Sequence, residues 1–156
     1  MKKLCCIATP VLLIIVALMA YKFLFQGAVT PSTDGRTAIL LNDEERNLVL
    51  AEMRTFLVST QQIVAALNTG DSQQVVAAAK AVGAAAQQQV PGTLIAKLPM
   101  EFKKLGFDTH QKFDLLALDA EQLGDKGQTL EQLAQLLQNC VACHAGYRID
   151  LEITAK

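Results

Sequence analysis

The residues with the clearest chemistry are two cysteines and a histidine near the carboxyl end of the 156-residue chain. Residues 140–144 read Cys-Val-Ala-Cys-His, the spacing that attaches c-type haem. Because positions i and i+3 of a helix project from one face, Cys140 and Cys143 can add to the two vinyl groups at one edge of a porphyrin. His144 is then carried beneath the ring, where an imidazole nitrogen can bind the iron. The motif predicts one covalently bound haem c per chain.

Other uses of two cysteines and a histidine fit this chain less well. A structural zinc site needs four ligands, and beyond the motif the part after residue 25 offers only His110. A thioredoxin-type pair belongs near a βαβ pattern, which is absent from the sequence. A third alternative is that the two cysteines stay unreacted. This fits poorly because free paired thiols would be hazardous in an oxidising compartment. A chance occurrence of the Cys-x-x-Cys-His motif is expected about once in a thousand chains of this composition.

The composition points to a helical protein built around an added apolar group. Hydrophobic residues make up 51% of the chain, but only 5% are aromatic and Trp is absent. A bundle of roughly 110 residues with so few aromatics has a thin core, which a buried haem would fill. The formal charge of −1 excludes a strongly basic surface for nucleic acid.

The amino-terminal segment is long and apolar enough to cross a membrane. Residues 4–21 carry no charge and would cover about 27 Å as a helix. We expect residues 1–25 to be a membrane anchor or signal segment, in the membrane through residues 4–25, with Lys2 and Lys3 in the cytoplasm. Cys5 and Cys6 are expected to be bystanders. The rest of the chain would lie on the periplasmic side of the bacterial inner membrane, or be soluble in the periplasm if the segment is cleaved.

The remaining chain divides into a linker and one helical domain. Residues 26–41 contain Gly, Pro, Ser and Asp and are expected to form a flexible linker. In the domain of residues 42–156, apolar spacings of three and four predict four helices. The first starts at a capping box of Asn42 and Glu45 and ends at Gly70; the second runs from Asp71 to Pro91, the third from Asp108 or Thr109 to Gly124, and the fourth starts at Thr129.

These elements predict an all-α protein. Four helices joined by short links are typical of an antiparallel four-helix bundle, here preceded by a transmembrane helix or signal-anchor. Without sustained strand alternation in the sequence, no sheet is expected.

The motif and its place on the last helix resemble the cytochrome c' and cytochrome c556 family of four-helix-bundle haem proteins. The resemblance is specific over residues 140–148, which read Cys-Val-Ala-Cys-His-Ala-Gly-Tyr-Arg. Over the rest of residues 42–150 it rests only on the pattern of helices and apolar positions. It implies haem bound through Cys140 and Cys143, ligation by His144, and contacts from Tyr147 and Arg148. It also places Met53, on the first helix, at the opposite face of the haem, where family members carry either Met or a bulky apolar residue.

The sixth ligand of the iron distinguishes two functions. If Met53 binds, His/Met coordination raises the reduction potential and favours one-electron transfer. If it does not, a pocket lined by Met53, Phe56 and Leu57 would admit NO or CO and give a gas-binding or NO-buffering protein. Met100 and His110 are weaker ligand candidates, His110 being expected at an exposed helix start. We expect no enzyme, because Thr60 is the only polar group on this face of the helix.

The expected partners are membrane-side or periplasmic redox proteins. The part after residue 25 holds 11 basic and 15 acidic residues, and the propionates of a haem would make it more negative. The family resemblance also allows a homodimer through the first two helices. No nucleic-acid partner is expected.

Overall fold

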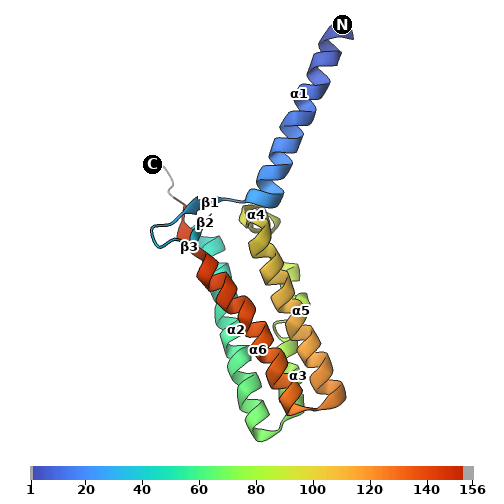
Figure 1. The fold of residues 1–156 in the computed structure, drawn as a ribbon, viewed down its shortest axis with the longest axis vertical. Helices are drawn as coiled ribbons and strands as arrows, with labels where there is room; N and C mark the ends of the chain where they lie inside the picture. Colours follow the sequence, from blue (N-terminus) through green and yellow to red (C-terminus); the bar gives the residue numbers. More distant parts are fainter. Residues whose placement is uncertain (1, 153–156) are drawn as a thin grey trace.

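A computed structural model describes residues 2–152, with side chains from residue 8, and is predominantly helical (Figure 1). The predicted all-α class is confirmed, although a small sheet is also present. The helices are α1 (Lys2–Tyr21), the π-helical turn η1 (Lys22–Gln26), α2 (Asp43–Thr69), α3 (Ser72–Lys80), the 3-10 turn η2 (Ala84–Gln89), α4 (Gly92–Lys97), α5 (Met100–Leu123) and α6 (Lys126–Gly146).

The predicted limits of the first long helix are confirmed. The amide of Glu45 donates to Asn42 Oδ1 at 2.8 Å, and the amide of Asn42 donates to Glu45 Oε2 at 3.1 Å, which completes the capping box. Gly70 ends α2 with a φ of +79°, a conformation that favours glycine. Asp71 caps α3 by accepting from the amide of Gln74 at 3.0 Å.

Other predicted limits were wrong. The second helix ends at Lys80 rather than near Pro91, because Asp114 accepts from the amide of Ala84 at 2.8 Å and gives the backbone another partner. The third begins at Met100, directly after Pro99, whose fixed φ suits a helix start. The fourth is capped by Asp125 rather than Thr129.

The segment expected to be a flexible linker instead contributes two strands to a three-stranded sheet. The sheet has the order β1-β2-β3 and consists of β1 (Val29–Pro31), β2 (Thr37–Leu41) and β3 (Tyr147–Leu151). β2 pairs antiparallel with β1 and parallel with β3, with Thr37 opposite Tyr147. Ala38, Ile39 and Leu41 are fully buried. The expectation failed because β3, one of the two partners of β2, lies more than a hundred residues away in sequence, and because the local signal for the β1–β2 hairpin was missed.

The sheet brings the two ends of the helical domain together. β2 leads directly into α2, and α6 leads directly into β3, so the start of α2 and the end of α6 meet at the sheet (Figure 1). α3 packs closely against α2 and α5, and α5 packs against α6. Among the described helices, α2 and α6 are not a closely packed pair. The resulting core cluster contains buried side chains from α2, α3, α5 and α6.

Phe113 is the largest fully buried side chain of this cluster and should be a large contributor to stability. Its side chain is 1% exposed and its ring stacks on that of Phe56, with centroids 5.5 Å apart. Phe113→Ala should lower the free energy of unfolding by about 3–5 kcal/mol, measured by chemical denaturation. The matched variant Leu115→Ala, on the same helix but 55% exposed, should change it by less than about 0.5 kcal/mol. Equal losses would show that this cluster does not stabilise the fold.

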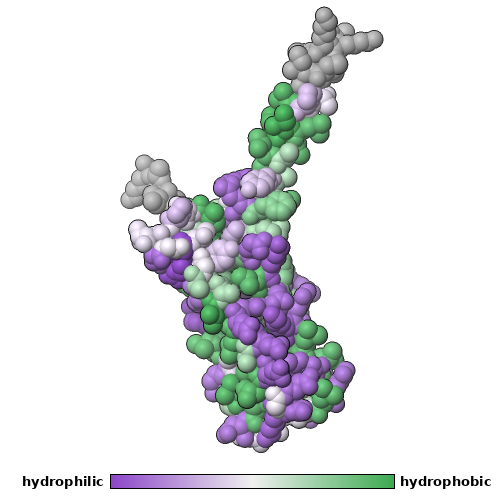
Figure 2. Space-filling model, viewed as in Figure 1, coloured by the Kyte–Doolittle hydropathy of each residue, from purple (hydrophilic) through white to green (hydrophobic). Residues whose placement is uncertain are grey.

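α1 projects from the sheet end, away from the other helices (Figure 1), and its surface is apolar (Figure 2). Residues 8–26 have a mean hydropathy of 2.1 and are not buried by the rest of the chain. By length and composition this is the one described helix that could cross a membrane, and a signal sequence would pass the same test. The side chains of Cys5 and Cys6 are outside the described part.

Candidate functional site

Cys140, Cys143 and His144 lie on the last two turns of α6, next to the sheet. Both thiols are free and half-buried, and His144 is exposed. In the described part of the chain, no side chain forms a hydrogen bond with the His144 ring. The helix thus presents two thiols and an unengaged imidazole within five residues.

The two thiols lie in apolar surroundings. Burial raises the pKa of Cys143 to about 11, with a further contribution from Cys140. Burial also raises the pKa of Cys140. At neutral pH both groups are therefore protonated thiols rather than thiolates, which is the opposite of an activated nucleophile.

Arg36 fixes the carboxyl end of α6, and the sequence analysis did not identify it. Its guanidinium donates to the carbonyls of His144 and Tyr147, each at 3.3 Å. Asp34 accepts from Arg36 Nε at 2.9 Å, and hydrogen bonds from Arg36 hold the pKa of Asp34 well below its usual value. A signal was present, because Asp34-Gly35 between two β-rich runs is typical of a hairpin.

The family resemblance implicates Tyr147 and Arg148, which directly follow α6. Their side chains contact different parts of the chain. Arg148 donates to Asp150 at 2.9 Å and to Asp34 at 3.3 Å, so it belongs to the Arg36 network. The half-buried Tyr147 ring meets Phe102 edge-on, with centroids 5.4 Å apart. Burial raises the pKa of Tyr147, with Cys143 adding to the effect.

Three candidate residues on α2 have different surroundings. Met53 is half-buried. Phe56 packs against the core, between Phe113 and the ring of His110. Leu57 is 71% exposed, which is unusual for a large apolar side chain in the middle of a helix. Phe56 therefore already has partners, while Leu57 has little cover.

α2 and α6 each carry a stripe of mostly apolar residues that lies away from their hydrogen bonds with α3 and α5. On α2, Met53, Leu57, Thr60 and Val64 recur at spacings of four, three and four. The other side of α2 faces α3, because the Ser59 hydroxyl donates to the carbonyl oxygen of Ala78 there. The members of this α2 stripe therefore lie on the flank turned away from α3.

The α6 stripe has the same character. Leu137, Val141 and His144 continue the spacing from Leu130 and Ala134. Asn139 and Gln132 bind side chains of α5 from the other flank. Val141 is 69% exposed, so this stripe is uncovered although it lies beside the half-buried thiols. We call these two largely exposed stripes, on helices that do not pack closely against each other, the apolar region; Cys140 and Cys143 lie beside its sheet end.

The prediction that His110 lies at an exposed helix start was wrong. α5 begins ten residues earlier, so His110 is inside the helix and 2% exposed. Its Nδ1 is 2.8 Å from the Val82 carbonyl oxygen, and its Nε2 is 3.3 Å from Glu52 Oε1. Both ring nitrogens thus face acceptor oxygens within the chain, so neither is directed toward a metal. Met100, the other weaker candidate, is the first residue of α5.

The His110–Glu52 contact predicts a pH dependence of stability. Burial alone would lower the pKa of His110, but the hydrogen bonds with Glu52 and Val82 raise it above its ordinary value. The contact therefore stabilises the fold fully below about pH 6.5, and this contribution is lost as pH rises through the folded-state pKa. The free energy of unfolding should fall over that window.

Denaturation of the Glu52→Gln variant across the same pH range should show a smaller fall. The control Glu131→Gln, an exposed site on α6, should keep the wild-type profile. Identical profiles for wild type and Glu52→Gln would rule out this pairing.

Comparison of the chain with protein-family models, with curated proteins and with solved structures gives no match. Within the described residues, no group of three or more His, Cys, Asp or Glu side chains gathers as a metal site. Candidate chemistry therefore rests on the thiol pair, the free imidazole and the apolar region beside them.

Proposed function

We propose that this protein is a c-type cytochrome that carries one haem on Cys140 and Cys143 and transfers single electrons. The observation that carries the proposal is the pair of half-buried thiols at the edge of the largely exposed apolar region on α2 and α6, two helices that do not pack closely against each other. Leu57 and Val141 are each about seventy per cent exposed, and a flat apolar group between the helices would cover them. The residues present fit a haem.

Each residue of the site has a defined task in this proposal. Cys140 and Cys143 would hold the haem through thioether bonds, and the His144 imidazole would bind its iron. Arg36 keeps the backbone at His144 in place through its two carbonyl contacts. The apolar side chains of the stripes exclude water. When bound, the haem supplies an iron that changes between the ferric and ferrous states.

Met53 is proposed as the sixth ligand of the iron. It belongs to the α2 stripe and is the one thioether on it, and ligation by a thioether together with an imidazole would raise the reduction potential. A ligand on each side would leave the iron six-coordinate in both oxidation states, which suits electron transfer.

The alternative function is binding of NO or CO by a five-coordinate haem. The favouring observation is the character of the α2 stripe, which is apolar apart from Thr60, so a vacant position beside it would admit small neutral molecules rather than anions. Gas binding or NO buffering would then replace electron transfer.

The fold and location are part of the proposal. Helices α2, α3, α5 and α6 would form the antiparallel four-helix bundle of the cytochrome c' and c556 type, with a short second helix. α1 would be an anchor in the bacterial inner membrane, with the haem domain on the periplasmic side. The partners would be redox proteins on that side of the membrane, and a homodimer through α2 and α3 is compatible with this arrangement.

Absorption spectra of the purified holoprotein, with and without CO, separate the two functions. Electron transfer predicts a low-spin ferric spectrum with a Met-to-iron charge-transfer band and a ferrous spectrum that CO changes little. A high-spin spectrum with ready CO binding would overturn the electron-transfer proposal in favour of gas binding.

A further inference from the structure

The chain between α1 and the sheet is packed against the helical domain. η1 ends at Gly27, which is buried and has a φ of +70°. A Cβ on Gly27 would overlap the Lys97 carbonyl oxygen and would come within 2.7 Å of the nitrogen of Pro99. Only glycine therefore suits this close approach between the segment after α1 and the α4–α5 junction.

Hydrogen bonds hold the same contact. Lys103 of α5 donates to the carbonyls of Phe23 and Leu24 at 3.3 and 3.2 Å, which cap the carboxyl end of the α1–η1 helix. The amide of Ala28 donates to the Lys97 carbonyl at 2.7 Å. We call Gly27, Ala28, Lys97 and Lys103 the joint.

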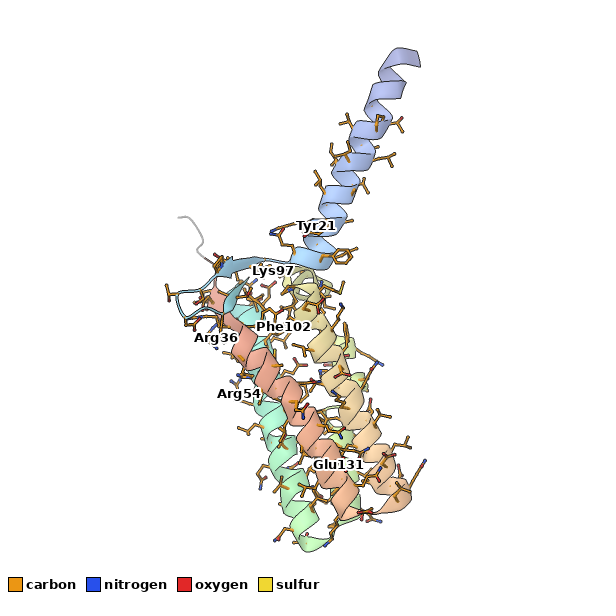
Figure 3. The ribbon with its side chains drawn as sticks, in the orientation of Figure 1. Tyr21, Arg36, Arg54, Lys97, Phe102 and Glu131 are labelled. Carbon is orange, nitrogen blue, oxygen red and sulfur yellow. The ribbon has the colours of Figure 1, made fainter. Side chains whose placement is uncertain are left out.

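The joint lies at the end of the domain that carries the thiols. Phe102, the neighbour of Lys103, contacts the Tyr147 ring, and Tyr147 follows the last turn of α6. Tyr21, Lys97, Phe102 and Arg36 all lie at this end in Figure 3, whereas Glu131 lies toward the opposite end. A short series of contacts thus connects the base of α1 to the Cys140–His144 turn.

We propose that the joint holds the sheet end of the domain, with the Cys140–His144 turn, against the headgroup surface of the membrane that α1 enters. The proposal rests on α1 being the anchor assigned under the proposed function. Tyr21 is exposed at the base of α1, and tyrosine is enriched where membrane helices reach the headgroup level. Phe23 and Phe25, exposed beside it, are apolar residues that suit the adjoining acyl region. The haem would then face redox proteins embedded in the same bilayer.

The test uses the full-length holoprotein in liposomes that contain a phospholipid with a photoreactive headgroup. After illumination, peptide mass spectrometry maps the lipid adducts. Adducts on the Ser32–Arg36 turn and on the first turn of α5 should exceed those on the Asn68–Ser72 turn severalfold, because the 27-residue α2 separates the two ends by about 40 Å. Equal adducts at both ends would overturn the proposal.

Two glycines provide a matched pair of variants. Gly27 and Gly35 both have positive φ, but a Cβ on Gly35 would meet no atom within 4 Å. Gly27→Ala should reduce the preference for the sheet end, and Gly35→Ala should keep it. If Gly27→Ala does not fold, Lys103→Met removes only the donor, with the exposed Lys104→Met as its control. An unchanged preference in a folded joint variant would overturn the role of the joint.

The adduct pattern does not depend on the haem. A colourless protein with sheet-end adducts would contradict the proposed cytochrome but leave the orientation intact. A coloured protein with evenly distributed adducts would contradict the orientation alone.

Discussion

A variant with both Cys140 and Cys143 replaced by alanine should contain no covalently bound haem when it is produced in cells that export and mature c-type cytochromes. The two thiols are the only described cysteines with defined surroundings, and both lie on one face of α6 beside the apolar region. Without them no thioether bond can form. Haem staining of the denatured protein on a gel measures the loss, which should be complete.

Cys5 and Cys6 offer the matched control, because they form a second close pair at the other end of the chain. Replacing both with alanine should leave the haem stain at its wild-type intensity. A stain that survives replacement of Cys140 and Cys143 would mean that the haem, if present, is held elsewhere.

Replacing Met53 with alanine should convert the haem from low-spin to high-spin. Alanine has no sulfur to donate, so the iron would lose its sixth ligand and become open to CO. The reduction potential should also fall, because the Met/His pair favours the ferrous iron. Absorption spectroscopy and a redox titration would follow both changes.

Met100→Ala is the control for the loss of a methionine. Met100 starts α5 and is not on the α2 stripe, so its replacement should leave the spectrum low-spin. If Met53→Ala also leaves the spectrum unchanged, Met53 is not the ligand and the electron-transfer assignment loses its main support.

Local signals in the sequence predicted local structure well. Asn42 and Glu45 are three residues apart, and Gly70 follows three residues after Leu67, the last apolar position of its helix, so both ends of α2 could be located without knowledge of the rest of the chain. The spacing of Cys140, Cys143 and His144 likewise requires only the geometry of one helix. Those three residues do lie together on α6.

Features that depend on distant pairing could not be predicted. Thr37–Leu41 pairs with Tyr147–Leu151 as well as with the nearby Val29–Pro31, and the short apolar run alone did not reveal the distant pairing. Arg36 belongs to the site because the hairpin turn reaches the end of α6, which only the sheet explains.

His110 shows the same limit in another way. Its polar neighbours in sequence suggested an exposed position, but Glu52 on α2 and the carbonyl of Val82 satisfy its ring nitrogens within the core. A buried histidine can be recognised only when the groups that bind it are known. Similarly, the exposure of Leu57 and Val141 became visible only when α2 and α6 were seen not to pack closely.

The central claim is a covalent bond between this chain and a haem, and acid-acetone extraction of the purified wild-type protein tests it most directly. We predict that the pigment stays with the precipitated protein and that intact-mass analysis gives one chain plus one haem. A colourless protein, or a pigment that passes entirely into the acetone, would contradict the account.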